Sequence, residues 1–149
     1  MVYLTQPGYP LDDSWIHQVI ARNLITGHGF GMVPDKPLST ATAPLWTLAM
    51  VIPGLLLGPI WSGIITGFLL GLLSLAAVYR LAEFFFRDKN APLFVTLLTV
   101  LCWPFIWGML SGMEVPLFTA LSLWGLYFYL KSSSLKDRYN CMCPESHGV

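Results

Sequence analysis

The chain has 149 residues, no net charge at neutral pH, 55% hydrophobic residues and only 11% charged residues. Soluble domains carry about 25% charged residues, so this composition argues against an ordinary soluble domain and favours a membrane protein. No basic cluster indicates a nucleic-acid partner, and three cysteines do not make a disulfide framework.

Residues 1–43 are predicted to form an extracytoplasmic loop that contains one amphipathic helix. Prolines and glycines favour a loop at the start, and Asp12 is suited to cap a helix over residues 12–26. The apolar arc of this helix is formed by Trp15, Ile16, Val19, Ile20 and Leu24, and its polar arc by Ser14, His17, Gln18 and Arg22. Such a helix is too polar to cross lipid and is suited to lie at a membrane interface.

Four apolar segments follow, and their lengths indicate different roles in a membrane. Residues 44–57 make a helix of about 21 Å that contains Pro53, whereas a hydrocarbon core is about 30 Å thick. We therefore expect this helix to be interfacial or re-entrant. The predicted transmembrane helices are residues 60–82, 93–110 and 115–130. Residues 131–149 form a polar tail, which we expect to be cytoplasmic and without regular structure.

The topology depends on whether residues 44–57 cross the membrane. If they do, there are four spans, and Asp12 and Glu114 lie on opposite sides. If they do not, there are three spans, and these acids share the outer side. Six of the eight basic residues form two clusters: Arg80, Arg87 and Lys89, and Lys131, Lys136 and Arg138. Three spans place both clusters on the cytoplasmic side, as the positive-inside rule requires. The predicted fold is therefore an all-α membrane protein with two juxtamembrane interfacial helices and about three transmembrane helices.

The adjacent carboxylates Asp12 and Asp13 then lie on the outer face together with Glu114. Charges next to a membrane are costly unless they have a function. The chemistry that suits them is to take a proton from a hydroxyl or to hold a cation at the boundary between water and lipid. Structural roles remain open as well, because Asp12 can cap its helix and Glu114 can cap the third span.

Four stretches of sequence together resemble the N-terminal region of GT-C glycosyltransferases. They are YPLDDSWIHQVIARNL at residues 9–24, GHGF at residues 27–30, TAPLW at residues 42–46 and SGMEVPLF at residues 111–118. The chain is similar to protein O-mannosyltransferases, to the aminoarabinose transferase of lipid A and to mycobacterial arabinofuranosyltransferases. The likeness covers about residues 9–130, and it lies in the ordered set of motifs more than in any one of them.

The resemblance implies a transferase that moves a sugar from a polyprenyl-phosphate donor to an acceptor hydroxyl, with inversion, on the outer face of a bacterial or archaeal cell membrane. The acceptor would be a lipid, a glycan or a protein. Asp12 matches the acid of the family that acts as catalytic base, Asp13 matches its acidic neighbour, and Glu114 matches the acid of a later outer turn. The helices over residues 12–26 and 44–57 match the juxtamembrane helices of the family.

Two departures from the family pattern lead us to expect an incomplete enzyme. The family has a membrane span before the acidic pair and many more spans after the third, and residues 132–149 resemble nothing in it. The alternatives are a small non-enzymatic membrane protein or inactive fragment that assembles with partner helices, or a piece of a transporter. Charged residues within the spans would favour transport, and the spans lack them except near one end.

Two further residues, His17 and Arg22, are candidates for binding substrate or a cation. Asp13 and His17 stand four residues apart, a spacing that can share a divalent cation, although a salt bridge or hydrogen bond is the simpler interpretation. We expect His17 to contact substrate. Arg22 is suited to a substrate phosphate or to lipid phosphates. No metal site and no cofactor is required by these patterns.

Overall fold

The structure of the chain is a computed structural model that describes residues 12–36 and 41–142, with side chains for residues 13–36, 41–58 and 61–133. The described residues form six helices and, apart from one isolated bridge between Val33 and Lys36, no β-structure. The all-helical prediction is therefore confirmed. The helices are α1 (Asp12–Ile25), α2 (Pro44–Leu57), α3 (Pro59–Phe85), α4 (Ala91–Leu101), α5 (Trp103–Leu110) and α6 (Val115–Met142).

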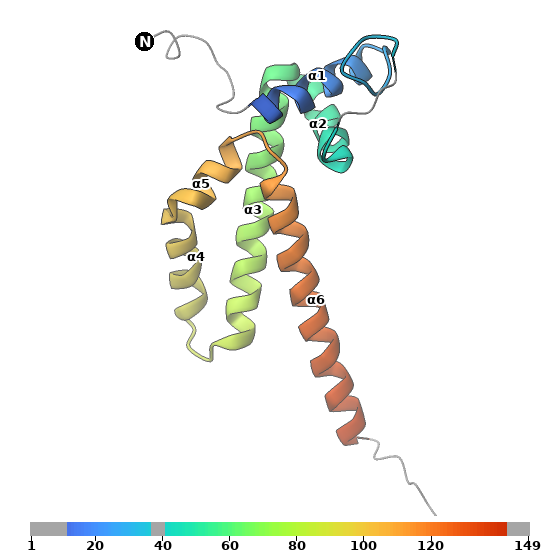
Figure 1. The fold of residues 1–149 in the computed structure, drawn as a ribbon. Coiled ribbons are helices and arrows are strands. Elements are labelled where there is room, and N and C mark those ends of the chain that lie inside the picture. Colours follow the sequence, from blue (N-terminus) through green and yellow to red (C-terminus); the bar gives the residue numbers. More distant parts are fainter. Residues whose placement is uncertain (1–11, 37–40, 143–149) are drawn as a thin grey trace, which may run out of the picture.

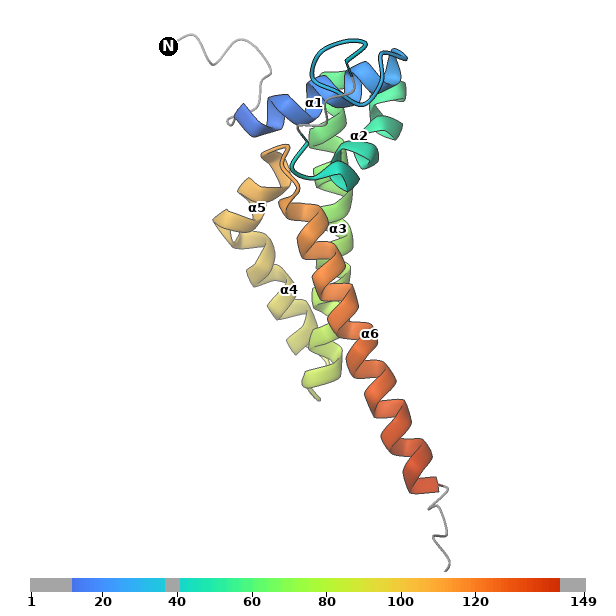
Figure 2. The same ribbon diagram turned by 45° about the vertical axis from the view of Figure 1, so that its right-hand side comes forward.

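The long helix α3 forms the axis of the molecule, with α1 and α2 at one end and α4 and α6 alongside it (Figure 1). Helices α1 and α2 lie at the N-terminal end of α3, where the turn between α5 and α6 also lies. Helix α6 runs beside α3 in the same direction, whereas α4 runs back beside α3 in the opposite direction and leads into α5, and a second view agrees (Figure 2). The turn between α3 and α4 consequently lies at the end of the molecule opposite to α1.

Helix α1 buries most of its polar arc, contrary to the expectation from its sequence. Ser14, His17 and Gln18 are buried against the rest of the molecule, whereas Trp15 is 41% exposed. These three polar residues fall on one face, because positions three and four apart lie together on a helix. This part of the polar arc therefore faces protein rather than water, while Arg22 is exposed and Ile20 of the apolar arc is buried.

Helix α2 has the bounds that the sequence predicts and forms a hairpin with the first half of α3. Trp46 and Met50 of α2 are fully buried with Ala21 of α1, and Leu70 of α3 packs against this core. At the other end of α2, a Cβ added at Gly54 would meet the Cβ of Ser62 at 3.4 Å. The two helices are thus antiparallel neighbours, which suits a re-entrant segment, while the position of α2 in a membrane stays a prediction.

One helix of the described residues is long and apolar enough to cross a membrane by itself. It is the part of α3 from Trp61–Phe85, with a mean hydropathy of 1.9. The helix extends beyond the predicted residues 60–82 at both ends and includes an exposed ion pair at 3.1 Å between Arg80 and Glu83. The pair α4 and α5 qualifies as a second span only if its bend is included in one segment.

The single helix predicted over residues 93–110 is wrong, because the chain breaks at Cys102 into α4 and α5, which are bent by 64°. Proline explains the break: Pro104 has no N–H to donate, and its ring collides with the carbonyl four residues earlier in a continuous helix. Pro104 instead occupies the first turn of α5, where a missing N–H costs little. Helix α5 then approaches α3 so closely that a Cβ at Gly67 would collide with the backbone oxygen of Met109.

Helix α6 continues well past the predicted end of the third span at residue 130. It reaches Met142, so the expectation that the tail lacks regular structure is wrong as far as that residue, while residues 143–149 lie outside the described part. Residues 131–142 contain neither glycine nor proline, and nothing in them stops a helix. The indole Nε1 of Trp124 donates to the backbone oxygen of Leu73 at 3.0 Å and ties α6 to α3.

Candidate functional site

The candidate site lies where α1, the start of α2 and the turn before α6 meet. Two buried hydrogen bonds fasten this turn: the Ser14 hydroxyl donates to the backbone oxygen of Ser111 at 2.7 Å, and the Trp46 indole donates to the backbone oxygen of Gly112 at 3.1 Å. The turn needs the left-handed backbone of Gly112, whose φ is +73°. Both bonds satisfy backbone oxygens that no helix uses, and they hold Glu114 next to α1.

His17 is at the centre of this site and is only 1% exposed. Its Nδ1 lies 3.0 Å from the hydroxyl oxygen of Thr47 on α2. Its Nε2 faces the hydroxyl of Thr42 at 3.4 Å and Oε2 of Glu114 at 3.6 Å. One imidazole therefore connects three segments that are far apart in the sequence.

Burial is the main influence on the charge of this imidazole. Removal from water lowers the pKa of His17 below its usual value, and the nearby carboxylates of Glu114 and Asp13 act in the opposite direction. Because burial is the larger effect, His17 is neutral at neutral pH. A neutral imidazole keeps one ring nitrogen that can accept a proton or a hydrogen bond.

Glu114 brings an acceptor of its own to the site. Its Oε2 is buried without a hydrogen bond in the described part of the structure, and it lies 3.6 Å from Nε2 of His17. A buried carboxylate oxygen without a hydrogen bond is costly, so a donor that reaches it is bound favourably. The side chain as a whole is 36% exposed, so the rest of it remains in contact with solvent. The pair of Glu114 and His17 thus suits a hydroxyl or another hydrogen-bond donor.

The series Thr47, His17 and Glu114 has the order of groups found in hydrolases that use a hydroxyl nucleophile, but it is not such a site. The Thr47 side chain is fully buried, and its hydroxyl also bonds to the backbone oxygen of Ala43 at 3.3 Å. A nucleophile has to reach its substrate, which this hydroxyl does not do. Thr47 instead orients the imidazole.

The structure unites some of the residues predicted from the sequence and separates others. His17 and Glu114 are together, and the exposed Asp13 lies one helical turn before His17. The spacing of four residues suggested that His17 would contact Asp13, but the carboxylate that its ring nitrogen approaches, at 3.6 Å, is that of Glu114. Asp12 begins α1, but its side chain lies outside the described residues. Arg22 is exposed in the last turn of α1.

No metal centre is found among the residues whose placement is described. There, His, Cys, Asp and Glu side chains do not come together in threes. A divalent cation at this site would therefore have to take ligands from its substrate or from residues outside the described part. The pair of Cys141 and Cys143 lies among the undescribed side chains.

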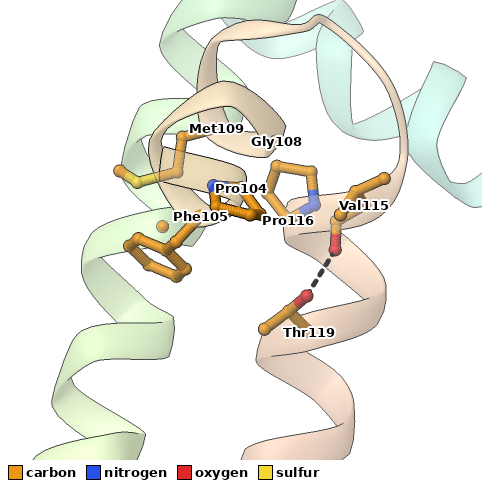
Figure 3. A pocket seen from close by; sticks show the side chains of 8 residues that line it. Pro104, Phe105, Gly108, Met109, Val115, Pro116 and Thr119 are labelled. Atoms are coloured by element: carbon orange, nitrogen blue, oxygen red, sulfur yellow. Dashed lines mark hydrogen bonds between the residues drawn. The ribbon is translucent and has the colours of Figure 1, made fainter. Parts of the chain in front are cut away.

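An apolar cavity lies next to the turn that carries Glu114 (Figure 3). Its volume is about 260 Å³, and it is lined by Gly71, Pro104, Phe105, Gly108, Met109, Val115, Pro116 and Thr119. The Thr119 hydroxyl donates to the backbone oxygen of Val115 at 2.8 Å, so it offers no free donor to a ligand. The glycines and prolines of α3, α5 and α6 create this space, because they place no long side chain in it.

Sequence reasoning did not find Ser14, Thr42, Thr47 or the buried position of Trp46. The available signal was the run TAPLW, which places Thr42 and Trp46 around the first turn of α2. Nothing in the sequence spacing indicates that the hydroxyls of Thr42 and Thr47 lie beside His17.

Comparison of the chain with protein-family models, with curated proteins and with solved structures finds no match in any of the three.

Proposed function

We propose that the chain is part of an integral-membrane glycosyltransferase that moves a sugar from a polyprenyl-phosphate donor to an acceptor hydroxyl, with inversion. The observation that supports this most directly is the contact between His17 and Glu114, whose polar atoms are 3.6 Å apart. These residues belong to two of the stretches that resemble GT-C glycosyltransferases, one in the first loop and one in a later turn. If the two stretches contribute to one active site, they have to lie close together in the fold, and His17 and Glu114 do so.

In this proposal, Asp12 is the base that takes the proton from the acceptor hydroxyl as its oxygen attacks the anomeric carbon of the sugar. The bond from that carbon to the phosphate breaks in the same displacement, so the configuration inverts and no glycosyl-enzyme intermediate forms. Glu114 and His17 accept hydrogen bonds from the substrate, and Asp13 lies beside them at the start of α1. Arg22 is the cation of α1 that suits the leaving phosphate.

The proposed topology has three passes through the membrane, formed by α3, by the bent pair α4 and α5, and by α6. Helix α2 is then a re-entrant partner of α3. In this arrangement α1 and the turn before α6, which carries Glu114, are at one membrane surface, and the turn between α3 and α4 is toward the other (Figure 1). Arg87 and Lys89 belong to the turn between α3 and α4, and Lys131 lies in the second half of α6. The positive-inside rule assigns the second surface to the cytoplasm. Large apolar side chains on the outside of α2, α4 and α6 support contact with lipid or partner helices.

The test is sugar transfer from a polyprenyl-phosphate donor in membranes of the native host, with substitutions made at the chromosomal locus. Asp12→Asn should reduce transfer by about 10²- to 10⁴-fold, because it removes the basic group. Protein abundance should not change, since asparagine caps a helix as well as aspartate does. Asp13→Asn is the matched control and should retain more activity. Transfer within about tenfold of wild type in Asp12→Asn would exclude this residue as the base.

A second candidate function is a non-enzymatic membrane protein that assembles with partner helices. It is favoured by the burial of His17, whose Nδ1 has a hydroxyl partner and which would serve only to fasten α1 to α2 and α6. In that case, substitution of Asp12 or Asp13 leaves sugar transfer in host membranes unchanged, while the chain co-purifies with a defined partner. The same chromosomal variants therefore separate the two functions.

A further inference from the structure

A second cavity lies at the end of the molecule opposite to His17, beside the turn between α3 and α4. Its volume is about 360 Å³, and unlike the cavity near Glu114 it has charged residues in its wall. It is lined by Tyr79, Glu83, Phe86, Arg87, Asp88, Lys89 and Pro92. Nothing in the proposed sugar transfer uses this end of the molecule.

The charges around this cavity are only partly paired. Glu83 is engaged by Arg80 at 3.1 Å, and Oδ1 of Asp88 accepts a hydrogen bond from the backbone N–H of Asn90 at 3.1 Å. Arg87 and Lys89 are both exposed, and neither forms an ion pair within the described residues. Two cations are therefore left to attract an anion at the cavity.

We propose that this cavity binds the phosphate head group of an anionic membrane lipid. The inference rests on the membrane placement in the proposed function, under which this end of α3 lies at the cytoplasmic surface. Guanidinium and ammonium groups are the side chains that bind phosphate, the first through paired hydrogen bonds and the second as a point charge. Tyr79 adds a hydroxyl to the wall of the cavity.

The surroundings of the cavity favour a lipid over a free phosphate ion. Phe84, Phe85 and Phe86 are each more than two-fifths exposed, and so are Leu93 and Phe94 at the start of α4. Aromatic side chains beside cations are typical of the zone where head groups meet acyl chains. Glu83 and Asp88 keep negative charge at the rim, which suits a phosphodiester with one charge better than inorganic phosphate with more.

The experiment is native mass spectrometry of the full chain purified in mild detergent, with phosphatidylglycerol and phosphatidylcholine added at equal concentration. The wild type should carry phosphatidylglycerol at least about fivefold more often than phosphatidylcholine. The double variant Arg87→Gln with Lys89→Gln should bind both lipids equally. The double variant Lys36→Gln with Lys131→Gln loses the same charge outside the cavity and should keep the preference of the wild type.

Three results would overturn the proposal. The first is equal binding of the two lipids by the wild type, the second is an unchanged preference after loss of Arg87 and Lys89, and the third is displacement of the lipid by phosphate. Inorganic phosphate is added in a separate arm: if millimolar phosphate removes the bound phosphatidylglycerol, the cavity is a site for free anions and not for lipid. This experiment measures no sugar transfer, so its outcome is independent of the Asp12→Asn assay in host membranes. A lipid preference together with transfer that does not depend on Asp12 refutes the proposed function alone, and transfer that depends on Asp12 without a lipid preference refutes only the lipid site.

Discussion

Nε2 of His17 on α1 lies 3.6 Å from Oε2 of Glu114 in the turn before α6. The contact joins the first described helix to the last one across the end of α3. The hydroxyl of Thr47, 3.0 Å from Nδ1 of His17, orients the imidazole. The hydrogen bond from Ser14 to the backbone oxygen of Ser111 holds the turn that carries Glu114 against α1. The packing of this end of the molecule and the geometry of the candidate site therefore depend on the same polar side chains.

The first prediction concerns the hydroxyl that orients His17. Thr47→Val keeps the shape of the side chain but leaves Nδ1 of a buried imidazole without its partner, which should cost about 1–3 kcal/mol of unfolding free energy. The measurement is reversible unfolding of the purified chain in mixed detergent micelles. Thr119→Val is the control, because its exposed hydroxyl bonds only within α6. If both variants lost the same amount of unfolding free energy, the hydrogen bond between Thr47 and His17 would contribute no more to stability than the bond of Thr119 within α6.

The second prediction concerns pH. Burial lowers the pKa of His17, so in the range below its usual value of 6.5 the unfolded chain binds a proton that the folded chain does not. The free energy of unfolding should therefore fall as the pH is reduced from 7.5 through 6.5, and it should recover on return to pH 7.5. Unfolding midpoints measured at several pH values across this range give the dependence of stability on pH.

The variant His17→Gln is the control for this pH dependence. It has no titrating ring, so its midpoint should be lower at pH 7.5 but should change less between pH 7.5 and 5.5. An identical slope in the variant and the wild type would assign the pH dependence to other groups.

The helical elements could be predicted from the sequence wherever composition changes sharply. Pro44 at the start and the pair Gly58-Pro59 at the end predict the bounds of α2, and the long apolar run that follows predicts α3. The break at Cys102 was missed because the run over residues 93–110 is apolar throughout, so only Pro104 marks it. The change to polar residues after residue 130 predicts an end to the helix there, but the helix continues to Met142, because these residues contain no helix breaker.

The site was only partly predictable, for a reason that α1 makes clear. An amphipathic pattern predicts that the polar arc faces water, but Ser14 and His17 are buried by contacts with Ser111 and Thr47, which lie far away in the sequence. A buried polar side chain needs a specific partner, and the pattern of one helix holds no information about that partner. Resemblance indicated that Glu114 belongs to the site, but the hydroxyls of Thr42 and Thr47 became visible only in three dimensions.

The third prediction concerns the close approach of α3 and α5. A methyl group at Gly67 would collide with the backbone oxygen of Met109, which a rotation of a side chain does not relieve. Gly67→Ala should therefore destabilise the chain by about 1–3 kcal/mol. In contrast, Gly125→Ala on α6 meets nothing within 4 Å and should be neutral or stabilise by up to about 1 kcal/mol. Similar midpoints in the two variants would mean that α5 does not pack on α3 at this distance.

The last prediction concerns topology. In a background without native cysteines, cysteines placed at Asp13 and at Met113 should react with a membrane-impermeant maleimide in intact cells. A cysteine placed at Lys89 should react only after the cells are opened. Met113 is chosen because the neighbouring Gly112 has a φ of +73°, a conformation that a cysteine rarely adopts.

If α3, the bent pair and α6 each cross the membrane once, positions 13 and 113 share the outer side. Labelling at 13 with protection at 113 would mean that α2 crosses the membrane as a fourth span. Four spans would place His17 and Glu114 on opposite sides of the membrane, so that result would refute both their contact and the three-span arrangement proposed for this chain.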